Sequence, residues 1–175
     1  MESKIVRPAS LTPPTEKVSD GWIGVMTVPK WSDGHQFLTW GLKGDGVCVV
    51  QFRHPKGERV AARVWFGAAT QGGPGQVHGG AICAVLDQLL GFSAWDKKLP
   101  SVTANLSTDF RKRVVLGTLV WVEAWVERVD GRKVYTKGWM ADEEGNILAE
   151  AQGLFILVNP EHFADDKAKP EQGAV

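Results

Sequence analysis

A single helical pattern among strand patterns constrains the fold of this chain more than any other feature. From Gly80 to about Ala94, apolar side chains recur at helical spacing, and neither a proline nor a β-branched run interrupts them. The polar residues Asp87 and Gln88 are adjacent, so the helix would have a wide apolar stripe and little surface for water. The pattern therefore predicts one long helix around which a sheet must wrap.

Most of the remaining chain reads as short strands. Runs rich in β-branched and aromatic residues are typical of strands, and they occupy positions 37–43, 47–53, 58–66, 101–110, 117–129, 132–142 and 146–158. Between 119 and 127, apolar residues alternate with Trp and Glu, which is the period of a strand. We expect an α+β fold, with a curved antiparallel sheet of about six strands around one central helix.

Turn signals separate these strands. Short segments rich in Gly, Asp, Asn or Pro are typical of hairpin turns, and they stand at 44–46, 54–57, 130–131 and 144–146. The length of 175 residues and the apolar fraction of 43% suit one compact domain. We predict a flexible tail at 1–20, a domain at 21–159 and a second tail at 160–175, because both ends are polar.

Charge and cysteine content narrow the possible partners and the compartment. Lys plus Arg and Asp plus Glu each number 20, so long-range attraction to nucleic acid or to an anionic membrane is not expected. The two cysteines, Cys48 and Cys83, have neither metal-type spacing nor a disulfide pattern. With no signal-peptide pattern and no run of about 20 apolar residues, a cytoplasmic location is the expectation.

Asp87 is the first candidate for a functional residue. On a helix it shares its side with Cys83, Ala84 and Gly91, which are all small. A carboxylate with small neighbours and an apolar border would be partly desolvated and would leave room for a ligand. The alternative is that Asp87 caps a neighbouring backbone or lies in a solvated groove, but carboxylates are rarely buried without a purpose.

The segment His78-Gly79-Gly80 begins the helix and forms a second candidate site. Backbone N–H groups at a helix N-terminus have no partner within the helix, and the helix dipole favours an oxyanion or phosphate there. Because Gly79 and Gly80 have no side chains, a ligand atom can approach their backbone closely. His78 could act as a base, but orientation of the loop is its simpler role. No metal site is expected, since the other histidines are scattered: His35, His54 and His162.

The spacing of the two candidates predicts a dimer. His78 and Asp87 are 9 positions apart, which is roughly 13 Å along one helix. Both therefore cannot contact one reacting atom from a single chain. If they act on the same substrate, the helix N-terminus of one subunit must meet the helix middle of another, as in an isologous dimer. We predict an obligate homodimer, with a dimer of dimers left open.

Two motifs resemble a known family. The run VHGGAICAVLD is similar to the HGG…D segment of hotdog-fold acyl-CoA thioesterases, which include the PaaI-like enzymes of the phenylacetate pathway and the mitochondrial thioesterase superfamily members. A later T-A-N-L strand, a basic turn and a V-x-G-R-K hairpin resemble the second of these branches more closely. The likeness extends over about residues 35–158. It implies a hotdog fold and a hydrolase of fatty acid metabolism, with coenzyme A as part of the substrate and no separate cofactor.

The resemblance also implies roles for individual residues. Asp87 would be the catalytic carboxylate, the Gly79 amide would polarise the thioester carbonyl, and Thr103 would help Asp87 to hold or activate water. His78 would shape the oxyanion loop. This sequence departs from the family at Gly72, six positions before the histidine, where many relatives have an Asn. Gln71 or Gln76 could compensate, or Thr103 alone could suffice.

The expected chemistry needs no nucleophilic Ser or Cys. A thioester carbonyl requires a donor for the developing oxyanion and a carboxylate that activates water or attacks directly. The phosphates of coenzyme A would be bound by Arg111, Lys112 and Arg113, the densest basic cluster, or by Arg132 and Lys133. Solvated turns explain both clusters equally well.

Two other functions remain open at this stage. A hotdog dehydratase or hydratase would use a His with an acidic residue, and a non-catalytic acyl-CoA-binding regulator or scaffold would need a partner module. His78 in the oxyanion loop disfavours the first, and Asp87 disfavours the second. The tryptophans on predicted strands, Trp121, Trp125 and Trp139, are expected to have packing or interface roles rather than to form a ligand cage.

Overall fold

A computed structural model describes residues 21–25, 39–40 and 46–159. The predicted tails at 1–20 and 160–175 lie outside the described residues, so their boundaries stay predictions. In chain order the elements are β1 (Ile23–Val25), β2 (Thr39–Trp40), β3 (Val47–Arg53), β4 (Val60–Phe66), the 3-10 helix η1 (Ala68–Thr70), α1 (Gly79–Asp96), β5 (Ser101–Phe110), β6 (Leu119–Asp130), β7 (Lys133–Ala141) and β8 (Ile147–Leu157).

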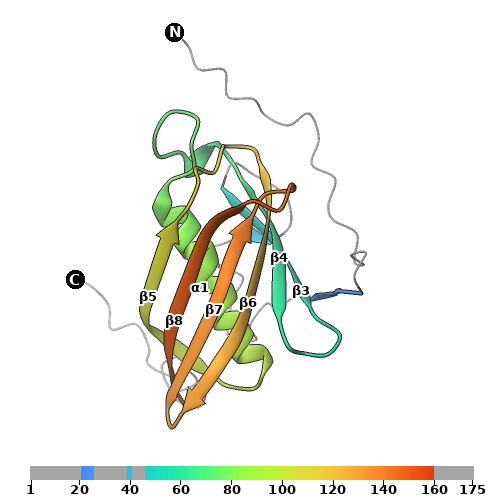
Figure 1. Cartoon of the computed structure of the whole chain (residues 1–175), viewed down its shortest axis with the longest axis vertical. Coiled ribbons are helices and arrows are strands. Elements are labelled where there is room, and N and C mark those ends of the chain that lie inside the picture. The colour runs from blue at the N-terminus through green and yellow to red at the C-terminus, as the bar shows by residue number, and fades with distance from the viewer. Residues whose placement is uncertain (1–20, 26–38, 41–45, 160–175) are drawn as a thin grey trace, which may run out of the picture.

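The sheet curves around the single α-helix of the described residues (Figure 1). Its strands run in the order β1-β3-β4-β6-β7-β8-β5, and β2 pairs with β3 away from this path. Six strands of seven residues or more, β3 to β8, form the body of the sheet, as predicted. The helix was also predicted, and it begins one residue earlier and ends two residues later than the sequence pattern indicated.

One predicted hairpin is wrong. The turn signal at 44–46 suggested that the strand before it folds back against β3, but β2 runs parallel to β3. β1 and β2 share one edge of β3: β1 pairs with Gln51–Arg53, and β2 pairs with Cys48 and Val49. Because β1 already covers one half of that edge, only a short second strand fits beside it.

The other predicted turns join neighbouring antiparallel strands. Gly57 and Gly131, with φ of 66° and 54°, lie in the β3–β4 and β6–β7 turns. In the β7–β8 turn, the carboxylate of Asp142 accepts hydrogen bonds from the backbone N–H and the side-chain amide of Asn146. Burial raises the pKa of Asp142, but these hydrogen bonds and the charge of Lys112 outweigh it, so the pKa lies below its ordinary value.

The main core lies between the helix and the concave face of the sheet. The apolar stripe predicted from the sequence is buried there, including Leu86, Leu89 and Leu90 at 0% exposure. Leu90 packs against two sheet glycines: a Cβ added at Gly138 or Gly153 would lie 3.3 Å from its methyl groups. The glycines therefore allow the helix to approach β7 and β8 closely, and burial of one such leucine contributes about 2 kcal/mol.

An ion pair fixes the C-terminal end of the helix to β3. The guanidinium of Arg53 bonds to the carboxylate of Asp96, the last helical residue, whose side chain is 5% exposed. A negative charge at a helix C-terminus opposes the helix dipole, and the positive charge of Arg53 offsets this. Among the described residues, no helix is long and apolar enough to cross a membrane.

Candidate active site

The central contact of the site joins the helix to the edge strand. Thr103, on β5, donates a hydrogen bond from Oγ1 to Oδ1 of Asp87 over 2.9 Å. Asp87 lies near the middle of α1 and is half-buried. The two residues that the sequence paired by resemblance are therefore in direct contact. The bond occupies one carboxylate oxygen and fixes the direction of the other.

An irregularity in β5 makes this contact possible. The pairing of β5 with β8 shifts between Thr103 and Asn105, so that Ala104 forms an extra residue. Alternate residues of a strand point to opposite faces, and an extra residue reverses which ones face the core. As a result, Thr103 before the bulge and Thr108 after it both face the helix, where Cys83 Sγ donates to Thr108 Oγ1 at 3.6 Å. Thr108 could not be identified from the sequence, because the bulge changes which residues of β5 face the helix and no sequence signal marks the bulge.

The helix row that faces β5 consists mostly of small residues. Gly79, Cys83, Asp87 and Gly91 are four positions apart, so they lie along one line of the helix surface. Asp87 therefore has the small neighbours Cys83 and Gly91 on its side of the helix, as the sequence predicted. The row ends at Trp95, whose indole N–H donates to the carbonyl of Ser101 at 2.9 Å.

His78 caps the beginning of the helix. Its Nδ1 accepts a hydrogen bond from the Gly80 N–H at 2.9 Å. One of the predicted donors, the Gly80 amide, is therefore already bonded within the loop. Within the part of the chain that the structure describes, no acceptor is bonded to the Gly79 N–H. Gly79 thus carries the open donor at the positive end of the helix dipole.

Backbone hydrogen bonds hold the loop before the helix in place. The His78 N–H donates to the Thr70 carbonyl at 2.7 Å, and the Val77 N–H donates to Val114 at 2.9 Å. Gly72 packs under this loop: a Cβ added there would lie 2.9 Å from the His78 Cα. An Asn at this position would push the loop away, which gives a physical reason for the departure of this sequence from the family pattern.

The two possible replacements for that Asn have different surroundings. The side-chain oxygen of Gln71 accepts from the Gly75 N–H at 3.4 Å, so it already stabilises its own turn. Gln76 is half-buried and bridges to Val115 through the backbone. Neither side chain has a hydrogen bond that links it to Asp87, among the bonds of the described residues.

The basic cluster after β5 is largely engaged with its own chain. Arg111 bonds to Glu150 at 2.8 Å and lies 3.5 Å from Asp109. The hydrogen bond from Arg111 to Glu150 and the charges of both acids raise the pKa of Arg111 above its ordinary value. Lys112 donates to the Asn146 side chain at 2.9 Å. Arg113 is exposed, and no ion pair or hydrogen bond of its side chain occurs among the described residues.

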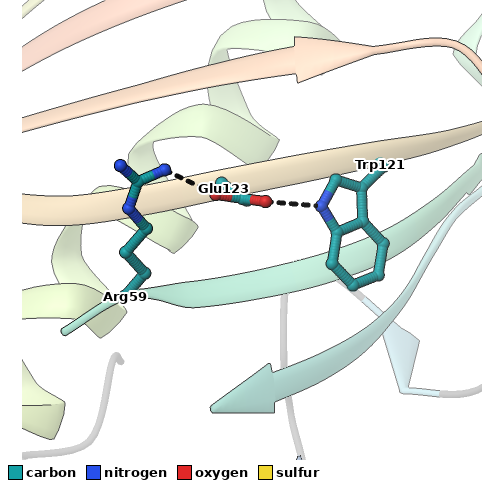
Figure 2. Close-up of polar contacts among 3 residues, drawn as sticks. All are labelled: Arg59, Trp121 and Glu123. Atoms are coloured by element: carbon teal, nitrogen blue, oxygen red, sulfur yellow. Dashed lines mark hydrogen bonds and ion pairs between the residues drawn. The ribbon is translucent and has the colours of Figure 1, made fainter. Parts of the chain in front are cut away.

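The convex face of the sheet holds a separate aromatic cluster. Trp121 stacks on Phe52 with ring centroids 5.6 Å apart and meets Trp22 edge to face at 5.7 Å. Its indole N–H donates to Glu123, which also accepts from Arg59 at 3.0 Å (Figure 2). Trp121 therefore has the packing role that the sequence predicted.

A cavity of about 370 Å³ lies beside this cluster. Trp22, Trp121 and Trp139 line it together with Arg63 and acidic residues of the β7–β8 turn. Asp87 and Gly79 do not line this cavity, which lies on the face of the sheet opposite the helix. Among the described residues, no three His, Cys, Asp or Glu side chains are close enough to hold a metal ion.

The chain is similar in sequence to known thioesterases. The model of the thioesterase superfamily matches residues 74–149, which include the helix, β5, β6, β7 and the beginning of β8. The acyl-coenzyme A thioesterase THEM4 of Xenopus laevis is 35% identical over 130 residues, which cover 71% of this chain and 58% of that protein. The chain spans little more than half the length of the curated relatives that it matches first.

Solved structures have the same fold. A thioesterase superfamily protein superposes with a TM-score of 0.58 and 32% identity, over 62% of this chain and 53% of that one. A Streptococcus mutans protein, solved with acetyl CoA bound, superposes with a TM-score of 0.56 and 17% identity, over 58% of this chain and 82% of that one. The chain is therefore similar to the thioesterase superfamily over residues 74–149, and its sheet around one helix is a hotdog fold.

Proposed function

We propose that this protein hydrolyses acyl-CoA thioesters to a free carboxylic acid and coenzyme A. The observation that carries the proposal is the hydrogen bond from Thr103 to Asp87 on a helix whose first N–H, at Gly79, has no partner among the described residues. A fixed carboxylate and an open oxyanion donor are the two groups that thioester hydrolysis requires. The name of the Xenopus relative, an acyl-coenzyme A thioesterase, supports the same chemistry.

In this mechanism Asp87 uses the oxygen that Thr103 leaves free. That oxygen either removes a proton from a water, which then attacks the carbonyl carbon, or attacks the carbon itself to form an anhydride that water later cleaves. In both routes the C–S bond breaks, coenzyme A leaves as a thiolate and takes up a proton, and the carbonyl carbon ends as a carboxylic acid. The role of Thr103 is the same in both.

The Gly79 N–H stabilises the negative charge that develops on the carbonyl oxygen. The helix dipole adds to this effect, because the amide lies at its positive end. Removal of one such donor typically raises the barrier by about 3 to 4 kcal/mol. His78 acts indirectly: by accepting from Gly80 it holds the first turn, and thereby the Gly79 N–H, in place.

The proposed site requires two subunits. Gly79 and Asp87 are eight residues apart on one helix, which corresponds to about 12 Å, whereas both groups must lie within about 3 Å of the same reacting carbonyl. A homodimer that places Gly79 of one subunit against Asp87 of the other satisfies this requirement twice. β5 has a free edge in the described sheet and carries Thr103, so pairing of β5 with β5 would bring the two half-sites together.

Coenzyme A would contact the basic residues that follow β5. Arg111 and Lys112 have partners in their own chain, so Arg113 is the residue of the cluster that is open to bind a phosphate. The Streptococcus mutans neighbour, which was solved with acetyl CoA, supports a ligand of this class. The reaction needs no cofactor, because coenzyme A is part of the substrate. A cytoplasmic location stays a prediction that rests on the cysteine usage of the sequence.

Thiol release from a panel of acyl-CoA esters tests the proposal. The panel contains short, medium, long and phenylacetyl esters, and the wild type is compared with Asp87→Asn. Turnover by the wild type, reduced by orders of magnitude in the variant, is the expected result. Tight binding of the esters without any turnover would instead indicate a non-catalytic acyl-CoA-binding protein. A dehydratase is not favoured, because Nδ1 of His78 is used to hold the loop.

A further inference from the structure

Phe110 packs its ring directly on Gly79. Apart from the neighbouring residues and the backbone of the helix, the atoms nearest to a Cβ placed on Gly79 belong to this ring, and the nearest, Cζ, would lie 3.3 Å away. The φ angle of Gly79 is not positive, so the backbone itself would accept an alanine. A side chain at position 79 would therefore displace the ring of Phe110.

The bulge in β5 directs Phe110 toward the helix. Phe110 pairs with Ala149, whose side chain is in the main core, and it lies two residues beyond Thr108, which contacts Cys83. Without the extra residue at Ala104, the strand would turn Phe110 to the other face. Thr103 lies before the bulge and Phe110 after it, and because of the bulge both side chains face the helix. One irregularity in β5 therefore explains the contact of Thr103 with Asp87 and the contact of Phe110 with Gly79.

Phe110 remains 53% exposed although its ring contacts the helix. Val115, which is 57% exposed, lies at the same end of the helix, because it bridges to Gln76 two residues before His78. The Gly79 N–H therefore lies at an end of the helix where the exposed side chains of Phe110 and Val115 form apolar surface. A carbonyl oxygen that accepts from this N–H would lie about 3 Å from the nitrogen, at the end of the helix where this apolar surface lies.

We propose that Phe110 is a positioning residue for the Gly79 donor, and that its ring packs against the acyl group next to the thioester carbonyl. The inference rests on the proposed function, and it adds a residue to which the sequence pattern assigns no role. The ring excludes water from one side of the N–H and limits the directions from which a carbonyl can approach. An apolar acyl group gains contact area on the ring, whereas a charged group next to the carbonyl loses solvation there.

A double-mutant cycle tests this role. Phe110→Ala is expected to lower kcat about tenfold, because the substrate loses part of its apolar contact with the ring, and Phe110→Leu is expected to lie between it and the wild type. Gly79→Ala should also slow the reaction, because its methyl group presses on the ring. In the Phe110→Ala background the same methyl group has room, so the second loss should be smaller than in the wild type. Val129→Ala, at an exposed apolar residue of β6, serves as the matched control.

A binding measurement separates the inference from the proposed function. Calorimetry with a thioether analogue of an acyl-CoA, which cannot be hydrolysed, should give an affinity about tenfold weaker for Phe110→Ala than for wild type or Val129→Ala, because part of the apolar contact is lost. If the wild type hydrolyses esters but Phe110→Ala behaves like Val129→Ala, or if the two losses in the cycle simply add, the inference is overturned and the proposed function stands. If the wild type binds the analogue through Phe110 but never hydrolyses esters, the proposed function fails and the contact with Phe110 stands. If neither binding nor hydrolysis occurs, both are overturned.

Discussion

Replacement of Thr103 by valine isolates the hydrogen bond on which the proposed mechanism depends. Valine has nearly the shape of threonine but cannot donate, so the change removes the 2.9 Å bond to Asp87 and little else. A hydrogen bond to a charged group contributes about 1.5 to 3 kcal/mol. Thr103 is exposed, so water can replace part of the interaction and the lower end of this range applies. At about 1.4 kcal/mol for each factor of ten, kcat should fall roughly tenfold.

The assay is thiol release at saturating acyl-CoA, with Thr103→Ser beside Thr103→Val. Serine keeps the hydroxyl, so it should recover most of the rate, and the melting temperatures of both variants should stay close to that of the wild type. KM should change less than kcat, because the bond acts on Asp87 and not on the bound ester. A Thr103→Val enzyme with unchanged kcat, or a serine variant as slow as the valine variant, would refute the reasoning.

Three further predictions concern the loop, the basic cluster and a turn. Gly72→Ala should lower the melting temperature and the activity, because its methyl group meets the His78 backbone, whereas Gly73→Ala, with open space around it, should have little effect on either. Arg113→Ala should raise KM for acyl-CoA but not for an acyl-pantetheine ester, and equal effects on both esters would argue against a phosphate contact. The pKa of Asp142 is lowered in the folded protein, so its contribution to stability is present above the pKa of the unfolded chain and is lost as the pH falls through the folded value. Melting temperatures of wild type and Asp142→Asn measured against pH should therefore differ at neutral pH and converge in acid.

The sequence was sufficient to predict the helix and the strands that surround it. The apolar residues of the helix repeat with a period that fits no strand, and five of them are buried at less than 4% exposure. The strand that contains Trp121 and Glu123 alternates between two environments, as its burial does in the structure. Strong local periodicity of this kind predicts the structure well, because the side chains on one face of a helix or strand share the same environment in the folded protein.

Other features depend on contacts that no local pattern contains. The parallel pairing of β2 follows from the space that β1 leaves on β3, and the bulge at Ala104 changes which residues of β5 face the helix. The contact between Phe110 and Gly79 is a consequence of that bulge. The partners of Arg111 come from β8 and from β5, and Lys112 bonds to Asn146, so two of the three residues in the basic run already have partners.

The proposed homodimer rests on the spacing of Gly79 and Asp87 along the helix and not on the bulge or the pairing of β2. Gly79 and Asp87 are eight positions apart on one helix, and a regular helix cannot bring them to one atom. A mixture of Asp87→Asn and Gly79→Pro subunits would therefore be informative, because a mixed dimer would contain one intact site if each site uses both chains. Recovery of activity on mixing would support the shared site.

The role of Asp87 in the proposed hydrolysis of acyl-CoA thioesters is tested most directly by single-turnover thiol release from an acyl-CoA ester with wild type and Asp87→Asn. Asparagine keeps the size of the side chain and can still accept from Thr103, but it has no negative charge to activate water or to attack. We expect a folded variant that binds the ester and releases thiol slower by a factor of about 10² to 10⁴. An Asp87→Asn protein as fast as the wild type would contradict the account.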